Sequence, residues 1–178
     1  MGTSKDCIAT NPSDQNVALT ALEATIQIQG AKGRRTVPIH EFYLLPGSTP
    51  HRETVLEPGD VIAGVTLPAP RPGTTSLYLK LRDRSAYEFA LASAAVVIEV
   101  RGGHIEYARV ALGGVGAKPW RSLEAEKAMQ GRPAGTATSR KAAEAALKDA
   151  RPPSQNAFKV ELSKRCLVRA LAMSTKTA

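Results

Sequence analysis

Two short stretches of the chain carry charged residues that could bind a ligand or take part in a reaction. Asp14 stands at the start of an expected helix, directly after a turn, which leaves its carboxylate exposed. Lys80, Arg82 and Arg84 alternate with other residues in the segment YLKLRDRSAY (78–87). In a β-strand this spacing places the three cations on one face, with Asp83 opposite. Such a row could bind an anion, or it could be a solvated edge strand that deters aggregation, and from these residues alone we favour the second.

A glycine-rich segment, GGVGAK (113–118), is a candidate phosphate-binding loop. It lacks the GxxxxGK[ST] spacing and is followed by Pro119 and Trp120 rather than by a helix start with Ser or Thr. We therefore favour a structural turn. Trp120, the single tryptophan, is expected to pack between a sheet and the helix that follows.

No spacing in the chain predicts hydrolytic or metal chemistry. The two cysteines lie far apart without a CxxC motif, and the histidines show no ligand spacing: Cys7, Cys166, His40, His51 and His104. Local spacing also indicates no Ser/His/Asp, Cys/His or paired-carboxylate arrangement. If the protein takes part in catalysis, we expect the chemistry to belong to a bound cofactor.

The composition is that of a folded globular protein with an excess of positive charge. The 178 residues are 43% hydrophobic, and 24 Lys and Arg against 16 Asp and Glu give a net charge of +8. The charges are scattered and no aromatic residues interleave with them, so we expect no nucleic-acid binding. No run approaches the roughly 18 apolar residues of a membrane helix, and no signal sequence is visible. We expect a cytoplasmic protein, or a periplasmic one if a partner that carries a signal exports it.

Periodicity predicts an α+β fold in two parts. The first part, residues 1–70, is expected to contain a helix after Ser13, a hairpin over 25–29 and 35–39, an extended loop over 42–58 and a strand over 61–67. The Pro- and Gly-rich segment 68–73 is the expected boundary.

The second part, residues 74–176, is predicted to be a three-stranded antiparallel sheet packed on C-terminal helices. Strands are expected over 76–82, 89–100 and 105–112, and helices over 123–130, over 140–150 and from about 157. By periodicity alone the middle strand could be a buried helix. Its Val-Val-Ile ending before a Gly-Gly turn favours a strand.

Several segments together resemble the flavin subunit of the xanthine dehydrogenase family of molybdenum enzymes. In order, they are CIATNPSD (7–14), GRRTVPIHEFY (33–43), ETVLEPGDVIAGVTLP (53–68), SLYLKLRDRSAYEFALASAAVVIEV (76–100) and ARVALGGVGAKPWR (108–121). The resemblance covers nearly the whole chain. It is strongest to the middle subunit of bacterial aldehyde oxidoreductases of this type, which also resembles the flavin subunit of carbon monoxide dehydrogenase.

The resemblance implies an FAD site and names its residues. Asp14 would contact the cofactor, with the backbone from Thr10 to Ser13 beside it. Ile62 would pack against the flavin, and Lys80 would approach the isoalloxazine ring, which reverses the preference for a solvated strand at that position. A cation near the ring would stabilise the negative charge of reduced flavin.

The resemblance also implies partners and a reaction. A large molybdenum-pterin subunit would oxidise an aldehyde or heterocycle, and a small subunit with iron-sulfur clusters would pass the electrons to FAD and on to an external acceptor. The chain resembles only the C-terminal half of such a flavin subunit. It lacks the family's Gly-rich AGGT-type loop, which holds the flavin pyrophosphate, and a second Gly-rich loop that precedes the CIATNPSD segment in the family. We therefore expect a half-site for FAD. The alternative is a non-catalytic assembly module that keeps the subunit contacts and has lost flavin.

Overall fold

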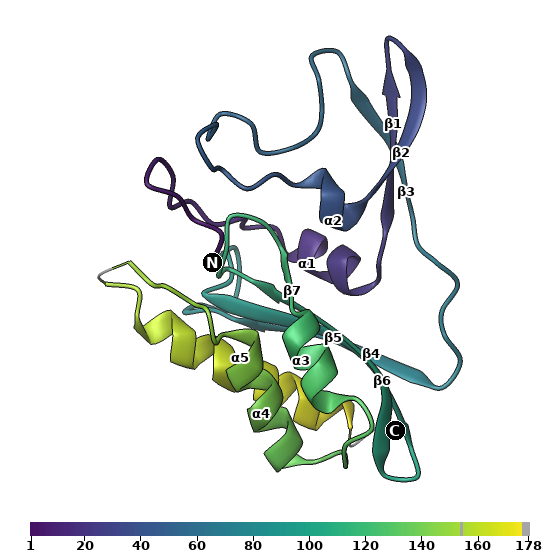
Figure 1. Cartoon of the computed structure of the whole chain (residues 1–178), viewed down its shortest axis with the longest axis vertical. Coiled ribbons are helices and arrows are strands. Elements are labelled where there is room, and N and C mark those ends of the chain that lie inside the picture. The colour runs from purple at the N-terminus through teal and green to yellow at the C-terminus, as the bar shows by residue number, and fades with distance from the viewer. Residues whose placement is uncertain (154, 176–178) are drawn as a thin grey trace.

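The computed structural model describes residues 1–153 and 155–175 and shows two antiparallel sheets with helices between and below them (Figure 1). The first unit has a three-stranded sheet in the order β2-β1-β3. Its elements are α1 (Asp14–Ala21), β1 (Thr25–Gly30), β2 (Gly33–Pro38), α2 (Ile39–Phe42) and β3 (Val61–Thr66). Ile26 and Ile28 of β1 point inward and pack with Ile39 and Phe42 of α2 in a small core.

The second unit has a four-stranded sheet in the order β4-β5-β6-β7. Its elements are β4 (Thr74–Leu81), β5 (Ala92–Arg101), β6 (His104–Gly113), β7 (Trp120–Arg121), α3 (Leu123–Met129), α4 (Thr136–Ala146) and α5 (Phe158–Ser174). Helices α3 and α5 cover one face of this sheet, and α4 packs against both of these helices (Figure 1). The main core lies between the sheet and these helices and includes Val96, Ile98, Val110, Met129 and Leu167.

Helix α1 belongs to the first unit but packs on the other face of the four-stranded sheet (Figure 1). Val17 and Ala21 contact Ala95 and Ala111, which alternate along β5 and β6 with residues of the main core. Because this sheet is covered on both faces, β5 is an almost continuous apolar run rather than an alternating one. Its small side chains let α1 approach closely, and a Cβ added at Gly113 would lie 2.5 Å from Cγ2 of Val17.

A charged network joins the two units at a second place. Glu23, which follows α1, accepts a hydrogen bond from Arg121 of β7 at 2.6 Å and pairs with Arg109 of β6 at 3.2 Å. Arg121 also pairs with the nearly buried Glu126 of α3 at 3.0 Å. Although partial burial acts in the opposite direction, these two guanidinium groups hold the pKa of Glu23 below its usual value.

The α+β class is confirmed, and residues 92–101 form a strand rather than a helix. Several details differ from the sequence predictions, among them the short helix α2 and the start of β5 at Ala92 rather than at residue 89. The sheet of the second unit carries a short fourth strand, β7, on which Trp120 packs against the main core. Helix α4 begins at Thr136 rather than Arg140, because Ser139 bonds back to the Gly135 carbonyl and residues 136–139 complete a helical turn. Strand β4 ends at Leu81, so Arg82 and Arg84 do not continue its face.

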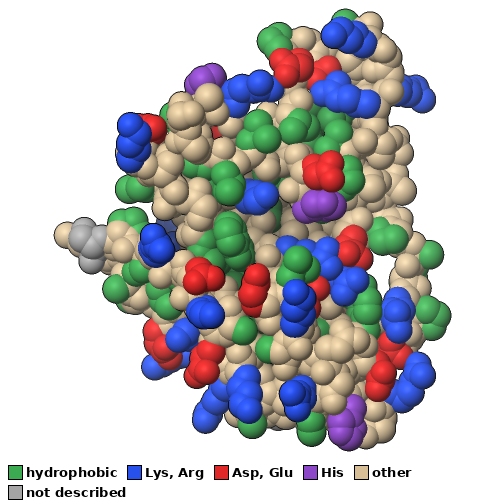
Figure 2. Space-filling view, viewed as in Figure 1, with side chains coloured by type: hydrophobic (Ala, Val, Ile, Leu, Met, Phe, Trp, Pro, Cys, Tyr) green, Lys and Arg blue, Asp and Glu red, His purple; other side chains and the backbone are tan. Residues whose placement is uncertain are grey.

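Charge is distributed over the surface in small groups. Figure 2 shows Lys and Arg side chains interspersed with Asp and Glu on the visible face, without a single basic stripe. Within the part of the chain that the structure describes, no helix has the length and apolar character needed to cross a membrane.

We expect Gly113→Ala to destabilise the fold by about 1–3 kcal/mol, because the added methyl group would push α1 away from the sheet. The measurement is urea unfolding followed by circular dichroism. Gly64→Ala is the matched control, since a Cβ there would meet only the flexible end of Gln27. Equal unfolding midpoints for the two variants would contradict this account of the packing.

The buried thiol of Cys166 on α5 makes stability depend on alkaline pH. Burial raises its pKa to about 12, whereas an unfolded cysteine titrates near pH 8.5. Above about pH 8.5 the unfolded chain therefore loses a proton that the folded chain retains, and stability falls with rising pH by at most about 1.4 kcal/mol per unit. We expect Cys166→Ala to reduce this decline between pH 9 and 11 in urea unfolding, and an unchanged slope would show that the thiol is not shielded.

Candidate functional site

The most specific polar arrangement between the two units is centred on Asp14. Lys80 Nζ donates a hydrogen bond to Asp14 Oδ2 at 2.7 Å, and Tyr78 Oη donates to Asp14 Oδ1 at 2.7 Å. Lys80 is 66 residues from Asp14 in sequence, and its side chain is only 19% exposed. Tyr78 and Lys80 are two residues apart on β4 and therefore lie on the same face of the strand, which presents both donors to the start of α1.

The turn before α1 fixes the position of the Asp14 carboxylate. Asn11 Oδ1 accepts a hydrogen bond from the backbone N–H of Ser13 at 3.2 Å. Ser13 is the N-cap, because its Oγ accepts from the backbone N–H of Asn16 at 3.2 Å. Asp14 is therefore the first helical residue, where a negative charge also interacts favourably with the helix dipole.

The glycine-rich segment 113–118 forms a turn that supports this arrangement. The carbonyl of Gly116 accepts a hydrogen bond from the backbone N–H of Asn11 at 2.9 Å. Gly114 has φ +71°, and a Cβ there would lie 2.8 Å from the Ala90 carbonyl oxygen. The glycines thus allow the chain to pass close to both the first turn and the start of β5.

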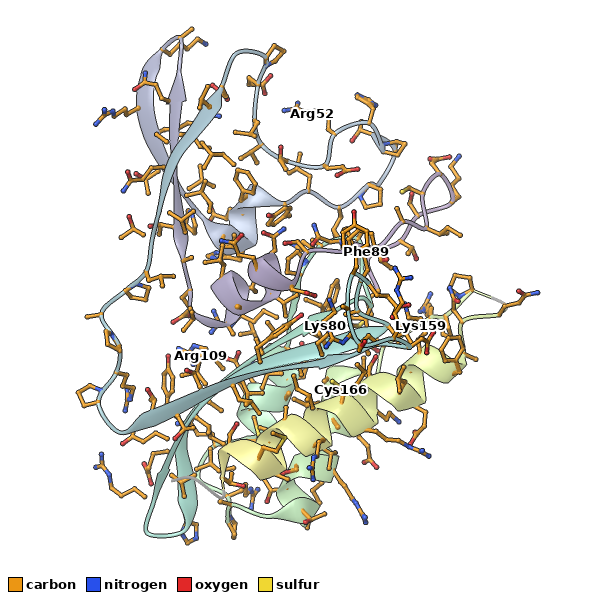
Figure 3. All side chains as sticks on the ribbon, turned by 180° about the vertical axis from the view of Figure 1, so that it is seen from behind. Arg52, Lys80, Phe89, Arg109, Lys159 and Cys166 are labelled. Carbon is orange, nitrogen blue, oxygen red and sulfur yellow. The ribbon has the colours of Figure 1, made fainter. Side chains whose placement is uncertain are left out.

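A cavity of about 720 Å³ opens beside the Asp14–Lys80 pair. Its volume falls within the range of small-molecule sites. Phe89 lies near Lys80 at the end of the sheet (Figure 3), and Tyr87 is 96% exposed. The lining residues are Pro12, Ser13, Asp14, Lys80, Arg84, Tyr87, Glu88 and Phe89. The cavity therefore combines an ammonium group with exposed aromatic side chains.

Residues 82–90 form a loop, whereas the alternating cations predicted that the strand face would continue to Arg84. Leu91 N–H donates to the Leu81 carbonyl at 2.9 Å and closes the base of the loop. Within it, the Glu88 carboxylate accepts hydrogen bonds from the backbone N–H groups of Asp83 and Arg84, both at 2.9 Å. These bonds turn the chain back, so Arg84 lines the cavity from the loop.

The structure brings together three of the residues that the sequence predicted for the site. Ser13, Asp14 and Lys80 line the same cavity. Thr10 lines a separate cavity of about 70 Å³ between the first turn and α5. Ile62 lies on β3 with 46% of its surface exposed and, among the described residues, lines neither cavity.

Sequence reasoning did not select the remaining lining residues. Tyr87, Glu88 and Phe89 line the cavity and belong to the segment that carries Lys80. Tyr78 precedes them in the same segment and does not line the cavity, but it donates to Asp14. The two-residue spacing of Tyr78 and Lys80 could have indicated that Tyr78 lies on the same strand face as Lys80. Burial raises the pKa of Tyr78, and the neighbouring Asp14 carboxylate raises it further. The Tyr78 hydroxyl therefore stays protonated as a donor to Asp14.

The residues present fit one part of a flavin. The Lys80 ammonium can meet the edge of a ring system that gains negative charge, and exposed aromatic side chains can cover its face. Among the described residues that line the cavity, the one further cation is Arg84, whose guanidinium already donates to the Tyr87 carbonyl. The site thus suits an isoalloxazine ring better than a diphosphate.

Each of the two units matches a known protein family. Residues 7–70 match the FAD binding domain in molybdopterin dehydrogenase, and residues 77–174 match the CO dehydrogenase flavoprotein C-terminal domain. The chain therefore belongs to the family of FAD-binding medium subunits of molybdopterin dehydrogenases. The resemblance stated from the sequence is confirmed.

Individual relatives agree with this family. The chain is 42% identical over 173 residues to the aldehyde oxidoreductase FAD-binding subunit PaoB of Escherichia coli, covering 97% of this chain and 51% of that protein. It is 37% identical over 120 residues to the glyceraldehyde dehydrogenase medium chain of Sulfolobus acidocaldarius, covering 67% of this chain and 40% of that protein. The chain thus spans about half the length, or less, of these curated relatives.

A solved structure shows the same fold. The structure is similar to carbon monoxide dehydrogenase from Hydrogenophaga pseudoflava in a form that lacks the Mo-pyranopterin moiety. The TM-score is 0.79 at 30% sequence identity, covering 90% of this chain and 55% of that one.

We expect Tyr78→Phe to lower the free energy of unfolding by about 0.5–1.5 kcal/mol, because the Asp14 carboxylate loses a donor. In an Asp14→Ala background the same change should have almost no effect, which a double-mutant cycle measures by urea unfolding. Tyr107→Phe is the control, since the ring of Tyr107 packs between two guanidinium groups. Additive effects of the first two substitutions would contradict the proposed contact.

Proposed function

We propose that this chain forms the lysine side of the FAD site in the flavin subunit of a molybdenum hydroxylase. The observation that carries the proposal is the 2.7 Å contact between Lys80 and Asp14 beside a cavity of ligand size. The match of residues 7–70 to an FAD-binding domain supports it. A bound flavin would supply the electron-transfer chemistry that the described side chains lack.

Four residues of the cavity then have definite tasks. The Lys80 ammonium stabilises negative charge at the ring edge, and Asp14 fixes the direction from which Lys80 approaches. Ser13 lies beside Asp14 as the N-cap and keeps the turn in place. The side chain of Phe89, which is 71% exposed, covers one face of the ring and excludes water from it.

We extend the proposal to two residues outside this cavity. Ile62 follows the PGD turn and presents an exposed apolar side chain on β3, where it would pack against the cofactor. Thr10 would place its backbone beside the part of the cofactor that leaves the cavity. Both assignments rest on the family resemblance.

The proposed partners are a large molybdenum-pterin subunit and a small iron-sulfur subunit. In this arrangement electrons from the iron-sulfur clusters pass through FAD to an external acceptor. An aldehyde is the favoured substrate of the complex, because the relatives include an aldehyde oxidoreductase subunit and a glyceraldehyde dehydrogenase chain. We also propose that residues 1–70 and 74–176 are the two domains, which agrees with the two matched ranges.

One feature favours the second candidate function, a non-catalytic assembly module. Strand β3 lies at the edge of its sheet and exposes several apolar side chains: Val61, Ile62, Val65 and Leu67 at its end. Exposed apolar groups on an edge strand are typical of a surface that another polypeptide covers. In a module without flavin this surface would be the functional part.

Titration with FAD, followed by flavin fluorescence, distinguishes the two functions. We expect Lys80→Met to weaken FAD binding about tenfold and to lower the two-electron potential of the bound flavin by about 30 mV, which corresponds to about 1.4 kcal/mol. Lys141→Met, on the exposed surface of α4, is the control. Folded wild-type protein that binds a partner subunit but no FAD would support the assembly module instead.

A further inference from the structure

The loop between β4 and β5 is held by one carboxylate. Oε2 of Glu88 accepts hydrogen bonds from the backbone N–H groups of Asp83 and Arg84, both at 2.9 Å. Hydrogen bonds to an ionised acceptor are about twice as strong as neutral ones. Together with the Leu91 to Leu81 bond at its base, this carboxylate sets the shape of residues 82–90.

The same residue also contacts the candidate site through its backbone. The Glu88 carbonyl accepts a hydrogen bond from Lys80 Nζ at 2.5 Å, while Asp14 Oδ2 accepts another at 2.7 Å. An ammonium group has three N–H donors. With two of them directed by Asp14 and Glu88, the third is left for a ligand in the cavity.

Packing does little to hold this loop in place. Tyr87 has φ +55°, an unfavourable conformation for a residue with a side chain, and is 96% exposed. Phe89 is also exposed, so neither aromatic residue anchors the loop in a core. The shape that brings the Glu88 carbonyl to Lys80 must therefore come mainly from hydrogen bonds within the loop.

We infer that Glu88 is a positioning residue for Lys80. Its carboxylate folds the loop so that its own carbonyl directs the ammonium group, and Asp14 completes the orientation from the other side. The consequence for flavin rests on the function proposed above, whereas the control of Lys80 by Glu88 does not. Loss of the carboxylate should leave the fold intact and release Lys80 from one of its two acceptors.

The first test needs no flavin and uses the whole chain with Glu88→Ala, Glu88→Gln and Glu106→Ala. Glu106 is an exposed control near the opposite end of β6 from Gly113. We expect Glu88→Ala to speed tryptic cleavage after Arg82 and Arg84 about tenfold and to shift the NMR signal of the ¹⁵N-labelled Lys80 ammonium. Glu88→Gln, whose amide oxygen still accepts hydrogen bonds, should restore much of both properties.

Wild-type cleavage rates together with an unchanged Lys80 signal in Glu88→Ala would overturn the inference. If Glu88→Ala does not fold, the near-isosteric Glu88→Gln provides the test. A cleavage rate about threefold above wild type with a shifted Lys80 signal then supports the inference, and values equal to wild type overturn it.

The second test measures FAD affinity in the same variants and in Lys80→Met. We expect about tenfold weaker binding for Glu88→Ala and no further loss when it is combined with Lys80→Met, because Glu88 acts through Lys80. Additive losses would show that Glu88 acts independently of Lys80 and would overturn the inference. If the wild-type chain binds no FAD, the proposed function fails, while the first test still determines the role of Glu88.

Discussion

The contact between Lys80 and Asp14 is the interaction on which the candidate site depends. It joins the first turn of α1 to the end of β4 and is supported by Tyr78 from the same strand. Removing either charged partner would leave the other without its counter-charge in a partly enclosed place, which is costly in proteins. The pair therefore defines both the junction of the two units and one wall of the cavity.

Small residues make this contact possible. Helix α1 can lie close to the four-stranded sheet because Ala95, Ala111 and Gly113 present little bulk to it. The network of Glu23, Arg109 and Arg121 fixes the far end of the same helix. With the helix held at both ends, the Asp14 carboxylate is kept at hydrogen-bond distance from β4 rather than moving with an independent unit.

The sequence predicted the regular elements better than the site. Local patterns identified most of the strands and helices, including β5, whose apolar run reflects a sheet covered on both faces. The pairing of Asp14 with Lys80 joins residues 66 positions apart, and only the family resemblance pointed to it. Alternation failed at Arg82 and Arg84, because the Glu88 carboxylate bonds to the backbone there and ends the strand. Strand propensity and alternation do not take account of a hydrogen bond from the side chain of a later residue to the backbone.

A crystal structure of the chain with FAD tests the central claim most directly. If the account holds, the edge of the isoalloxazine ring lies about 3 Å from Lys80 Nζ, with Asp14 still bound to the same ammonium group. A ring bound elsewhere on the molecule, with the cavity between Asp14 and Phe89 filled by water alone, would contradict it.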